Sequence, residues 1–441
     1  MLIDFLTRYN QLFTFYLIFP AMIFLGVYLS IKLRFLQLFK LKMGLMQLFK
    51  KGDGGKGNLT HYQAVASVLA GNFGTGNISG MAVALTMGGP GALVWMWVMA
   101  FFGSIIQYSS CMLAVKYRQQ NSRGEYVGGP MYYLAHLGFK KLAVIFSVLV
   151  LFGALGVGIF AQINSMTLSL GKIGISPWFS SLAIAAVVGA VILGGVGRVA
   201  KVSSTIIPIM ALLYLGAASV ILAFNASHIL PAFGIMFDAA LGKGAVIGGT
   251  LGYTMMKMVS TGLGRALFAT DVGTGYVPIL QAGAKTRHPV IDGVVALVAP
   301  FLVMIVCTTT ALVLIVTGAY TIEGLQSTNM IVYAFQSGVG NTLGLIVVNI
   351  ALILFGYTTI LAWGCCFERA IGYLFGGRFR LSFRLLFIAL IPVGAFLRVD
   401  FVWVFADITL SMMAFCNLIG IFSLSKEVVK DSQDFFMLTK S

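Results

Sequence analysis

The sequence predicts an all-α integral membrane protein of about eleven transmembrane helices, in which one N-terminal helix precedes two inverted repeats of five. Three observations support this fold class: an apolar composition, a series of apolar segments long enough to cross a bilayer, and glycine-rich interruptions in two of those segments. Hydrophobic residues make up 59% of the 441 residues, and only 10% are charged. With a mean hydropathy of +0.96, the chain has too little polar surface to cover a soluble protein of this length.

Apolar segments recur along the chain at the length that a bilayer requires. A helix needs about twenty apolar residues to cross the hydrocarbon core. The segments that meet or approach this length are residues 13–31, 63–87, 91–115, 141–167, 178–197, 203–224, 245–277, 293–318, 342–365, 383–398 and 401–424. The tenth is the shortest of them, and Arg384, Pro392 and Arg398 crowd its ends.

Basic residues indicate which way the spans run. Lys and Arg accumulate in the cytoplasmic loops of membrane proteins, and the loop after the first span carries Lys32, Arg34, Lys40, Lys42, Lys50, Lys51 and Lys56. Alternation from that loop leaves only a few of the 29 basic residues outside, namely Arg8, Lys172, Lys243 and Arg398. The predicted topology has the N-terminus outside and the C-terminus in the cytoplasm. Because the net charge of +16 is spread over alternate loops, it does not predict nucleic-acid binding.

Residues 32–51 form a basic and apolar segment after the first span. Leucines, methionines and phenylalanines interleave with basic residues there, as in a helix that lies on the anionic cytoplasmic surface of a membrane. A solvated linker is the alternative interpretation.

The second span contains the first glycine-rich interruption, Gly71 to Gly80, which reads Gly-Asn-Phe-Gly-Thr-Gly-Asn-Ile-Ser-Gly. Each Gly costs a helix interior about 1 kcal/mol relative to Ala, so this run predicts a break in the helix. Irregular backbone at membrane depth is tolerated only where it is buried in protein or lines a cavity. The free N–H groups of the second half-helix suit a carboxylate, and unwound carbonyls suit a small cation. The interruption therefore predicts a binding site for an anionic group and a cation.

The seventh span contains a similar interruption, Thr261-Gly-Leu-Gly-Arg-Ala-Leu-Phe-Ala-Thr-Asp-Val-Gly-Thr-Gly275. Five spans begin with each interrupted one, and because five is odd the two blocks enter the membrane from opposite sides. The predicted organisation is an N-terminal helix and basic segment (1–62), a first repeat (63–240), an inverted second repeat (241–425) and a cytoplasmic tail (426–441). The alternative is that both glycine runs are close helix contacts of the small-xxx-small type.

Charged residues are rare inside the spans, where each costs about 2.5 to 3.5 kcal/mol at a helix centre. They are Lys257, Arg265, Asp271 and Asp407. Asp271 could ligate a cation, orient the break or pair with Arg265, and the last option would need an unwound chain between them. A structural or gating role is expected for Arg265, and Lys257 receives no assignment.

Uncharged polar residues in the spans offer further candidate ligands. Gln162 and Asn164 in the fourth span can donate and accept hydrogen bonds, although such side chains often join helices to one another. Thr358 and Thr359 in the ninth span present adjacent hydroxyl oxygens, the ligand type that a hard cation prefers. Bonding of a Thr hydroxyl to its own helix is the alternative.

A series of motifs runs in order along nearly the whole chain. They are Gly74-Thr-Gly-Asn-Ile-Ser-Gly80, Gly88-Gly-Pro-Gly-Ala-Leu-Val-Trp-Met-Trp97, Gly128-Gly-Pro-Met-Tyr-Tyr133, Gln162-Ile-Asn-Ser165, His288-Pro-Val290, Cys307-Thr-Thr-Thr-Ala311, Tyr373-Leu-Phe-Gly376, Phe405-Ala-Asp-Ile408, Met413-Ala414 and Asn417-Leu-Ile419. Together they resemble the alanine or glycine:cation symporter family. This resemblance implies the leucine-transporter-type fold of five-plus-five inverted repeats and sodium-coupled uptake of small neutral amino acids.

The resemblance also implies roles for particular residues. The residues it implies for the substrate are Thr75, Gly76 and Asn77 for the carboxylate, Gln162 as a further contact, and Phe268, Thr270 and Asp271 in the unwound segment that takes the amino group. The implied sodium ligands are the carbonyls of Ala70 and Phe73 and the hydroxyls of Thr358 and Thr359. The chain departs from the family pattern after Phe268, where the usual Ser-Asn-Glu-Ala-Gly reads Ala269-Thr-Asp-Val-Gly273.

We therefore expect sodium-coupled symport of alanine or glycine by alternating access, in a prokaryotic cytoplasmic (inner) membrane. Proton coupling with Asp271 as the titrating group is the nearest alternative. A passive channel would need a continuous polar lining, whereas the polar residues gather at two breaks. No enzyme is predicted, because the sequence has no HExxH motif and its histidines lie in loops or at span ends.

Overall fold

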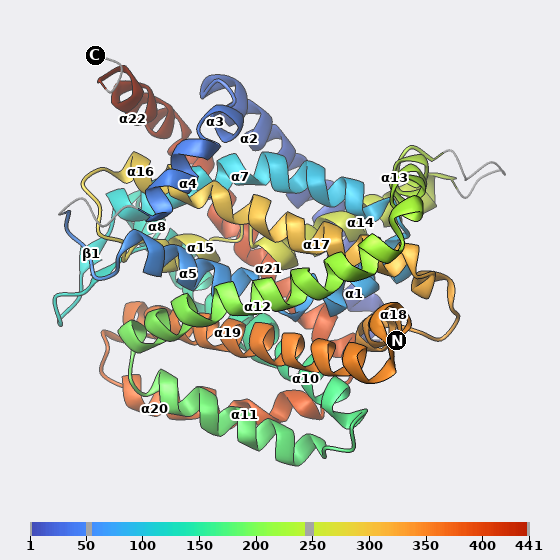
Figure 1. Cartoon of the computed structure of the whole chain (residues 1–441). Helices are drawn as coiled ribbons and strands as arrows, with labels where there is room; N and C mark the ends of the chain where they lie inside the picture. The colour runs from blue at the N-terminus through green and yellow to red at the C-terminus, as the bar shows by residue number, and fades with distance from the viewer. Residues whose placement is uncertain (1, 50–54, 243–250, 439–441) are drawn as a thin grey trace.

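The computed structural model describes residues 2–49, 55–242 and 251–438. These residues form a bundle of helices joined by short loops (Figure 1). The start of the predicted seventh span at residues 245–250 lies outside the described residues, as do Lys50, Lys51, Lys243 and the last residues of the tail.

Helices make up almost all of the secondary structure, and short stretches of 3-10 or π geometry are labelled η. The first part contains α1 (Leu2–Phe13), η1 (Thr14–Ile18), α2 (Phe19–Lys32), α3 (Leu36–Phe39), α4 (Leu41–Phe49), α5 (His61–Asn72), η2 (Thr75–Asn77), α6 (Ser79–Gly88), α7 (Ala92–Lys116), β1 (Gln119–Gln120), β2 (Tyr126–Val127), α8 (Pro130–His136), α9 (Lys140–Gly153), η3 (Ala154–Phe160), α10 (Ala161–Gly171), α11 (Pro177–Ile192), α12 (Val196–Phe224) and α13 (Ala226–Ala240). The second part contains α14 (Leu251–Thr270), α15 (Tyr276–Gln281), α16 (Pro289–Ala296), α17 (Val298–Val316), η4 (Ala319–Thr321), α18 (Ser327–Val339), α19 (Asn341–Phe375), α20 (Arg380–Leu390), η5 (Pro392–Ala395), α21 (Val399–Ser423) and α22 (Ser425–Leu438).

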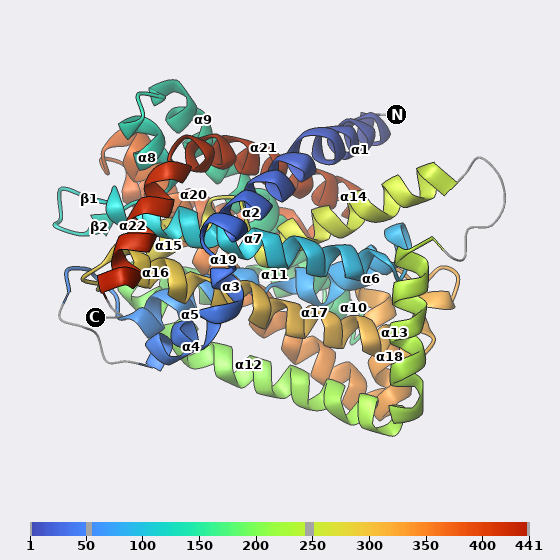
Figure 2. The same cartoon turned by 90° about the horizontal axis from the view of Figure 1, so that it is seen from above.

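Most of the long helices run along one common direction, so the molecule has two ends (Figures 1 and 2). The β1–β2 hairpin, α22 and the C-terminus lie at one end, which we call the inner end because the predicted topology places the C-terminus in the cytoplasm. The N-terminus, α13 and α18 lie at the other, the outer end. Helix α7 is buried along most of its length and packs against α2, α14 and α16. The apolar core therefore runs through the middle of the bundle.

Among the described residues, seven helices are long and apolar enough to cross a membrane: Ile3–Lys32, Ala92–Lys116, Lys140–Gly171, Val196–Phe224, Pro289–Val316, Asn341–Phe375 and Val399–Ser423. Shorter apolar helices occupy Ser79–Gly88, Pro177–Ile192 and Ala226–Ala240. The chain is thus an integral membrane protein, while the count of eleven spans and the two repeats remain predictions. In the predicted tenth span the helix α20 has only 11 residues, and η5 starts at Pro392, which lacks the N–H that an α-helix uses.

The basic segment after the first span forms the helices α3 and α4. Leu38, Phe39 and Met46 are exposed, whereas Gln37 and Leu48 are buried. Helix α4 packs against α16. The described residues of this segment are therefore a half-buried helical layer at the inner end, and the alternative of a solvated linker is wrong for them.

Candidate functional site

The predicted interruption of the second span is present in the structure. Helix α5 ends at Asn72, and Gly74 is extended (φ −99°, ψ −178°) before the short 3-10 turn η2. The Asn77 amide donates to the Asn72 carbonyl at 2.6 Å, across the break. The Cys307 thiol of α17 donates to the Asn77 Oδ1 at 3.3 Å. The Asn77 side chain therefore holds the two half-helices in place, in addition to any contact that its backbone makes.

Gln162 reaches the first interruption from α10. The Thr75 N–H donates to Gln162 Oε1 at 2.9 Å, and the Gln162 amide donates to the Val157 carbonyl in the π-helical stretch η3 at 2.8 Å. Gln162 is fully buried. Two of the residues expected at the substrate are thus in direct contact, and the amide oxygen occupies an N–H group that a carboxylate could take.

Gly76 lies against the ring of Phe268. A Cβ atom at Gly76 would lie 2.4 Å from two ring carbons of Phe268, closer than real side chains approach. Phe268 in turn packs on Trp403 of α21 with ring centroids 4.9 Å apart, and both rings are buried. We call Phe268 and Trp403 the aromatic layer. Only a glycine at position 76 lets the backbone lie directly under this layer.

The second interruption is also present and contacts the first. Helix α14 ends at Thr270, and α15 begins at Tyr276. The expectation that Phe268 and Thr270 are unwound is therefore wrong, because both still lie in α14 and the break starts at Asp271. Asp271 has a left-handed conformation (φ +51°), as do Gly273 and Gly275, so the chain cannot continue as a helix there. The Asn72 amide donates to the Thr270 carbonyl at 2.8 Å. This hydrogen bond joins the two breaks directly.

Asp271 has no charged partner in the described part of the chain. Its side chain is buried, and neither carboxylate oxygen accepts a hydrogen bond from any described residue. Arg265 pairs instead with Asp407 of α21, so the option of an Arg265–Asp271 pair is wrong. The reason is that α14 remains helical through Thr270, and residues six apart on a helix point to different faces.

Both threonines of α19 have hydroxyls within hydrogen-bond distance of their own helix, Thr359 through the Phe355 carbonyl at 2.9 Å, but only one of them also reaches α5. Thr359 Oγ1 donates toward the Ala70 carbonyl at the end of α5, with an oxygen separation of 2.9 Å. Thr358 Oγ1 bonds to the Leu354 carbonyl of its own helix at 3.0 Å and lies 3.7 Å from the Met210 sulfur. Only Thr359 therefore faces the first interruption in this structure.

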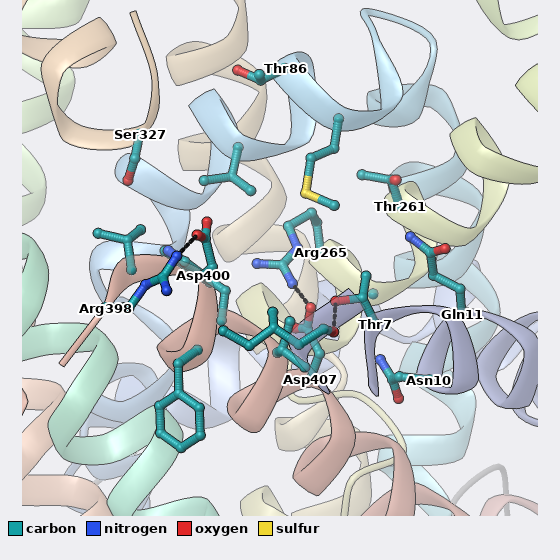
Figure 3. Close-up of a pocket in the computed structure, with 18 of the residues that line it drawn as sticks. Thr7, Asn10, Gln11, Thr86, Thr261, Arg265, Ser327, Arg398, Asp400 and Asp407 are labelled. Atoms are coloured by element: carbon teal, nitrogen blue, oxygen red, sulfur yellow. Dashed lines mark hydrogen bonds and ion pairs between the residues drawn. The ribbon is translucent and has the colours of Figure 1, made fainter. Parts of the chain in front are cut away.

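A large cavity opens at the outer end above the aromatic layer. It has a volume of about 1020 Å³, and we call it the outer vestibule. Its wall includes polar side chains from several elements, among them Thr7, Asn10, Gln11, Thr86, Thr261 and Ser327 (Figure 3). Arg265 and Asp407 point toward one another at this cavity (Figure 3), and the Arg265 guanidinium lies 4.9 Å from the Trp403 ring centroid. The ion pair and the aromatic layer thus separate the vestibule from Gly76.

At the inner end, the segments that flank the two broken helices contact one another. The chain before α5 pairs with the chain after α15 through bridges that join Lys56 to Thr286 and Leu59 to Ala284. The Arg118 guanidinium donates to the carbonyls of Lys56 and Ala284 at 2.7 and 2.8 Å. The structure therefore has a cavity at its outer end and tied segments at its inner end.

Sequence reasoning missed several residues of this region. Trp403 gave no signal, because an aromatic residue in an apolar span is ordinary. The ion pair between Arg265 and Asp407 depends on tertiary packing, so the sequence could not indicate it. Tyr276 is a further case: its hydroxyl has no hydrogen bond to a described residue, and a Cβ at Gly71 would lie 1.6 Å from it. The glycine at position 71 was the available signal that another group approaches α5 closely.

Known proteins are similar in sequence to this chain along most of its length. The whole chain, residues 1–441, matches the model of a family described as the sodium:alanine symporter family. It is 39% identical over 419 residues to an uncharacterized transporter of Haemophilus influenzae, covering 94% of this chain and 92% of that protein. It is 36% identical over 426 residues to the sodium/alanine symporter AgcS of Methanococcus maripaludis (94% and 93% covered). It is 30% identical over 416 residues to the sodium/proton-dependent alanine carrier protein of Bacillus sp. (89% and 91% covered).

The full-length family match and the coverage of these relatives agree with the motifs and with the two interrupted helices. The chain belongs to the sodium:alanine symporter family and is a membrane transporter, not an enzyme.

Proposed function

We propose that this protein carries a small neutral amino acid, alanine or glycine, together with sodium across the bacterial cytoplasmic membrane by alternating access. The observation that carries the proposal is the direct hydrogen bond between two broken helices, from Asn72 to the Thr270 carbonyl. Broken helices that meet inside a membrane expose backbone groups to a solute and an ion at one place. Eleven spans arranged as one helix and two inverted repeats fit the termini at opposite ends of the bundle (Figure 2).

The substrate carboxylate is assigned to the first break and the amino group to the second. Thr75, Gly76 and Asn77 form the turn whose backbone N–H groups would meet the carboxylate, with Gln162 beside them. Phe268, Thr270 and Asp271 lie at the end of α14. Support comes from the approach of Gly76 to the Phe268 ring, which brings the backbone of the first break next to the end of α14.

Sodium is assigned to oxygens that lie between α5 and α19. The carbonyls of Ala70 and Phe73 and the hydroxyls of Thr358 and Thr359 would surround it. Support comes from the separation of 2.9 Å between Thr359 Oγ1 and the Ala70 oxygen, because a cation beside them would meet two oxygens at once while the hydroxyl proton points to the Phe355 carbonyl. The Thr358 hydroxyl would join this set by turning away from Met210.

Alternating access would use two sets of contacts, one on each side of the breaks, as closures that open in turn. On the outer side the substrate would pass the Arg265–Asp407 pair and the aromatic layer after leaving the vestibule. On the inner side it would be released when the tied segments around Arg118 separate. Only one of these closures would be open at a time.

We expect purified protein in liposomes to accumulate labelled alanine when sodium is higher outside. A zwitterion carries no net charge, so one sodium ion moves one charge inward, which at about 100 mV supplies about 2.3 kcal/mol, or roughly fifty-fold accumulation before the sodium gradient is added. The measurement is uptake of alanine and glycine with sodium or choline outside. Uptake that stops at equal concentrations on both sides, whatever the sodium gradient, would contradict coupling.

Proton coupling is the second candidate, because the buried Asp271 carboxylate has no hydrogen-bond partner among the described residues. An unpaired buried carboxylate is costly when charged and tends to bind a proton or a cation. If it is the coupling group, an inward pH gradient without sodium drives alanine uptake in the wild type, and Asp271→Asn abolishes that uptake. Under the sodium proposal we expect no accumulation from the pH gradient alone. Glu323→Gln, which removes one carboxylate from an exposed position outside the vestibule wall, is the matched control.

A further inference from the structure

A second cavity lies at the inner end, and no residue of the two breaks lines it. It has a volume of about 310 Å³ and lies between the β1–β2 hairpin, α8, α19 and the start of α20. One carboxylate, Glu368, and two arginines line it, Arg369 of α19 and Arg380 of α20, and the arginine side chains are only 11% and 10% exposed. Buried guanidinium groups need partners for their donors, so the contacts of these two side chains are informative.

The Arg380 side chain has no hydrogen bond to another residue in the part of the chain that the structure describes. Its closest carboxylate oxygens belong to Glu125 at 3.7 Å and Glu368 at 3.6 Å, and its buried Nε has no hydrogen-bond partner there. Arg369 reaches Glu125 at 3.4 Å. Charge-assisted hydrogen bonds are normally about 2.7 to 2.9 Å long. Both guanidinium groups are therefore near carboxylates without being bound tightly by them.

The neighbouring Arg384 shows what a satisfied pair looks like in the same structure. Its Nε and Nη2 donate to the Glu368 carboxylate at distances of 2.7 to 2.9 Å, in a two-pronged pair. Because Glu368 is already occupied in this way, it leaves Arg380 with long contacts only. The cluster of Arg369, Arg380 and Arg384 with Glu125 and Glu368 has one positive charge more than it has negative charges, and an anion would balance it.

Glu125 lies near the same two guanidinium groups that an anion in the cavity would contact. It lies on the turn of the hairpin, its side chain is 35% exposed, and the Asn121 amide holds it inward at 2.8 Å. Burial would raise the pKa of Glu125, but the Asn121 hydrogen bond and the charges of Arg369 and Arg380 lower it below its usual value. Glu125 is thus ionised at neutral pH and competes with any anion for the same two guanidinium groups.

The surroundings of the cavity indicate where that anion comes from. Phe375, Phe379 and Leu381 stand beside the arginines and are about half exposed or more. Tyr132 and Tyr373 line the cavity and pack edge to face. Exposed apolar residues, tyrosines and arginines together are typical of the level at which lipid headgroups meet a membrane protein.

We propose that the Arg369–Arg380 cavity binds the phosphate group of an anionic molecule, an acidic phospholipid of the cytoplasmic leaflet in preference to soluble phosphate. A phosphate accepts two hydrogen bonds from one guanidinium group, so it fills the donors that Glu125 and Glu368 leave open. The exposed Phe375 and Phe379 would contact its acyl chains. Binding would join the hairpin, α19 and α20 at the inner end.

The test measures thermal unfolding and binding of the full-length protein in neutral detergent. The probes are a short-chain phosphatidic acid, a phosphatidylcholine with the same chains, and sodium phosphate. We expect phosphatidic acid to raise the unfolding temperature and the other two to have little effect. Arg380→Gln and Arg369→Gln should each weaken binding of phosphatidic acid by about tenfold or more, since each removes charge-assisted hydrogen bonds. Arg378→Gln, which removes a charge from an exposed position two residues away, is the matched control and should bind like the wild type.

The Glu125→Gln variant distinguishes two hypotheses: that the cluster binds a ligand, and that it has only a structural role. If a phosphate competes with the Glu125 carboxylate, this variant should bind phosphatidic acid several-fold more tightly, whereas a structural role predicts only a less stable protein. Stabilisation by sodium phosphate alone, equal to that by phosphatidic acid, would support the cavity but overturn the lipid as its source. Equal binding by wild type, Arg369→Gln and Arg380→Gln would overturn the proposal, and Arg369→Gln decides alone if Arg380→Gln does not fold.

Discussion

Replacing Gly76 with leucine is expected to abolish alanine binding while the protein still folds and inserts. A Cβ at this position would already lie 2.4 Å from the Phe268 ring, and leucine adds three more carbons. Phe268 cannot simply retreat, because Trp403 packs on its ring at 4.9 Å. The leucine would therefore displace the aromatic ring or fill the space in which we place the substrate carboxylate. The measurement is a binding titration of alanine against purified protein in sodium and in choline.

Gly80→Ala is the matched control for this substitution, since Gly80 lies in α6 just after the same break. A Cβ there would come no closer than 3.4 Å to Trp403, which is an ordinary contact, and alanine favours a helix over glycine by about 1 kcal/mol. We expect this variant to bind alanine like the wild type. If Gly76→Leu also bound alanine normally, with a monodisperse elution profile, the substrate carboxylate would not lie at the first break.

The two interruptions could be predicted from the sequence because their cause is local. Four glycines between Gly71 and Gly80, and the glycines around Asp271, destabilise a helix wherever the rest of the chain lies. Counting the spans between them predicts two inverted five-span repeats, which stay a prediction, whereas their contact through Asn72 is seen only in the structure. The mean hydropathy likewise indicated the membrane class without any knowledge of contacts.

Partner choice could not be predicted, because it depends on residues far apart in the chain. Arg265 pairs with Asp407, which lies 142 residues away, rather than with the nearby Asp271. Gln162 accepts a hydrogen bond from the Thr75 N–H, which lies 87 residues away in the chain. The residue type of Gln162 alone suggested only a polar contact. The short hairpin that carries Glu125 has strands of two residues, too short to give a periodic pattern. The contacts of these residues therefore emerge only once the chain is folded.

Thr359→Val is expected to raise the apparent Km for sodium in alanine uptake by about tenfold or more, because it removes one oxygen ligand and keeps the shape of the side chain. Thr359 Oγ1 lies 2.9 Å from the Ala70 oxygen, the position from which it can share an ion with the first break. Thr359→Ser retains the hydroxyl and should behave like the wild type. The measurement is alanine uptake into liposomes over a range of sodium concentrations.

Thr358→Val provides the internal comparison, since the two threonines are adjacent and chemically identical. The Thr358 hydroxyl bonds to the Leu354 carbonyl and faces Met210, so it must rotate before it can reach an ion beside Ala70. Because the Thr359 hydroxyl already lies beside the Ala70 oxygen, we expect a smaller rise in the sodium Km for Thr358→Val than for Thr359→Val. Equal effects of the two substitutions would mean that both hydroxyls turn toward the ion. A Thr359→Val protein with wild-type sodium dependence would place the ion away from the space between α5 and α19.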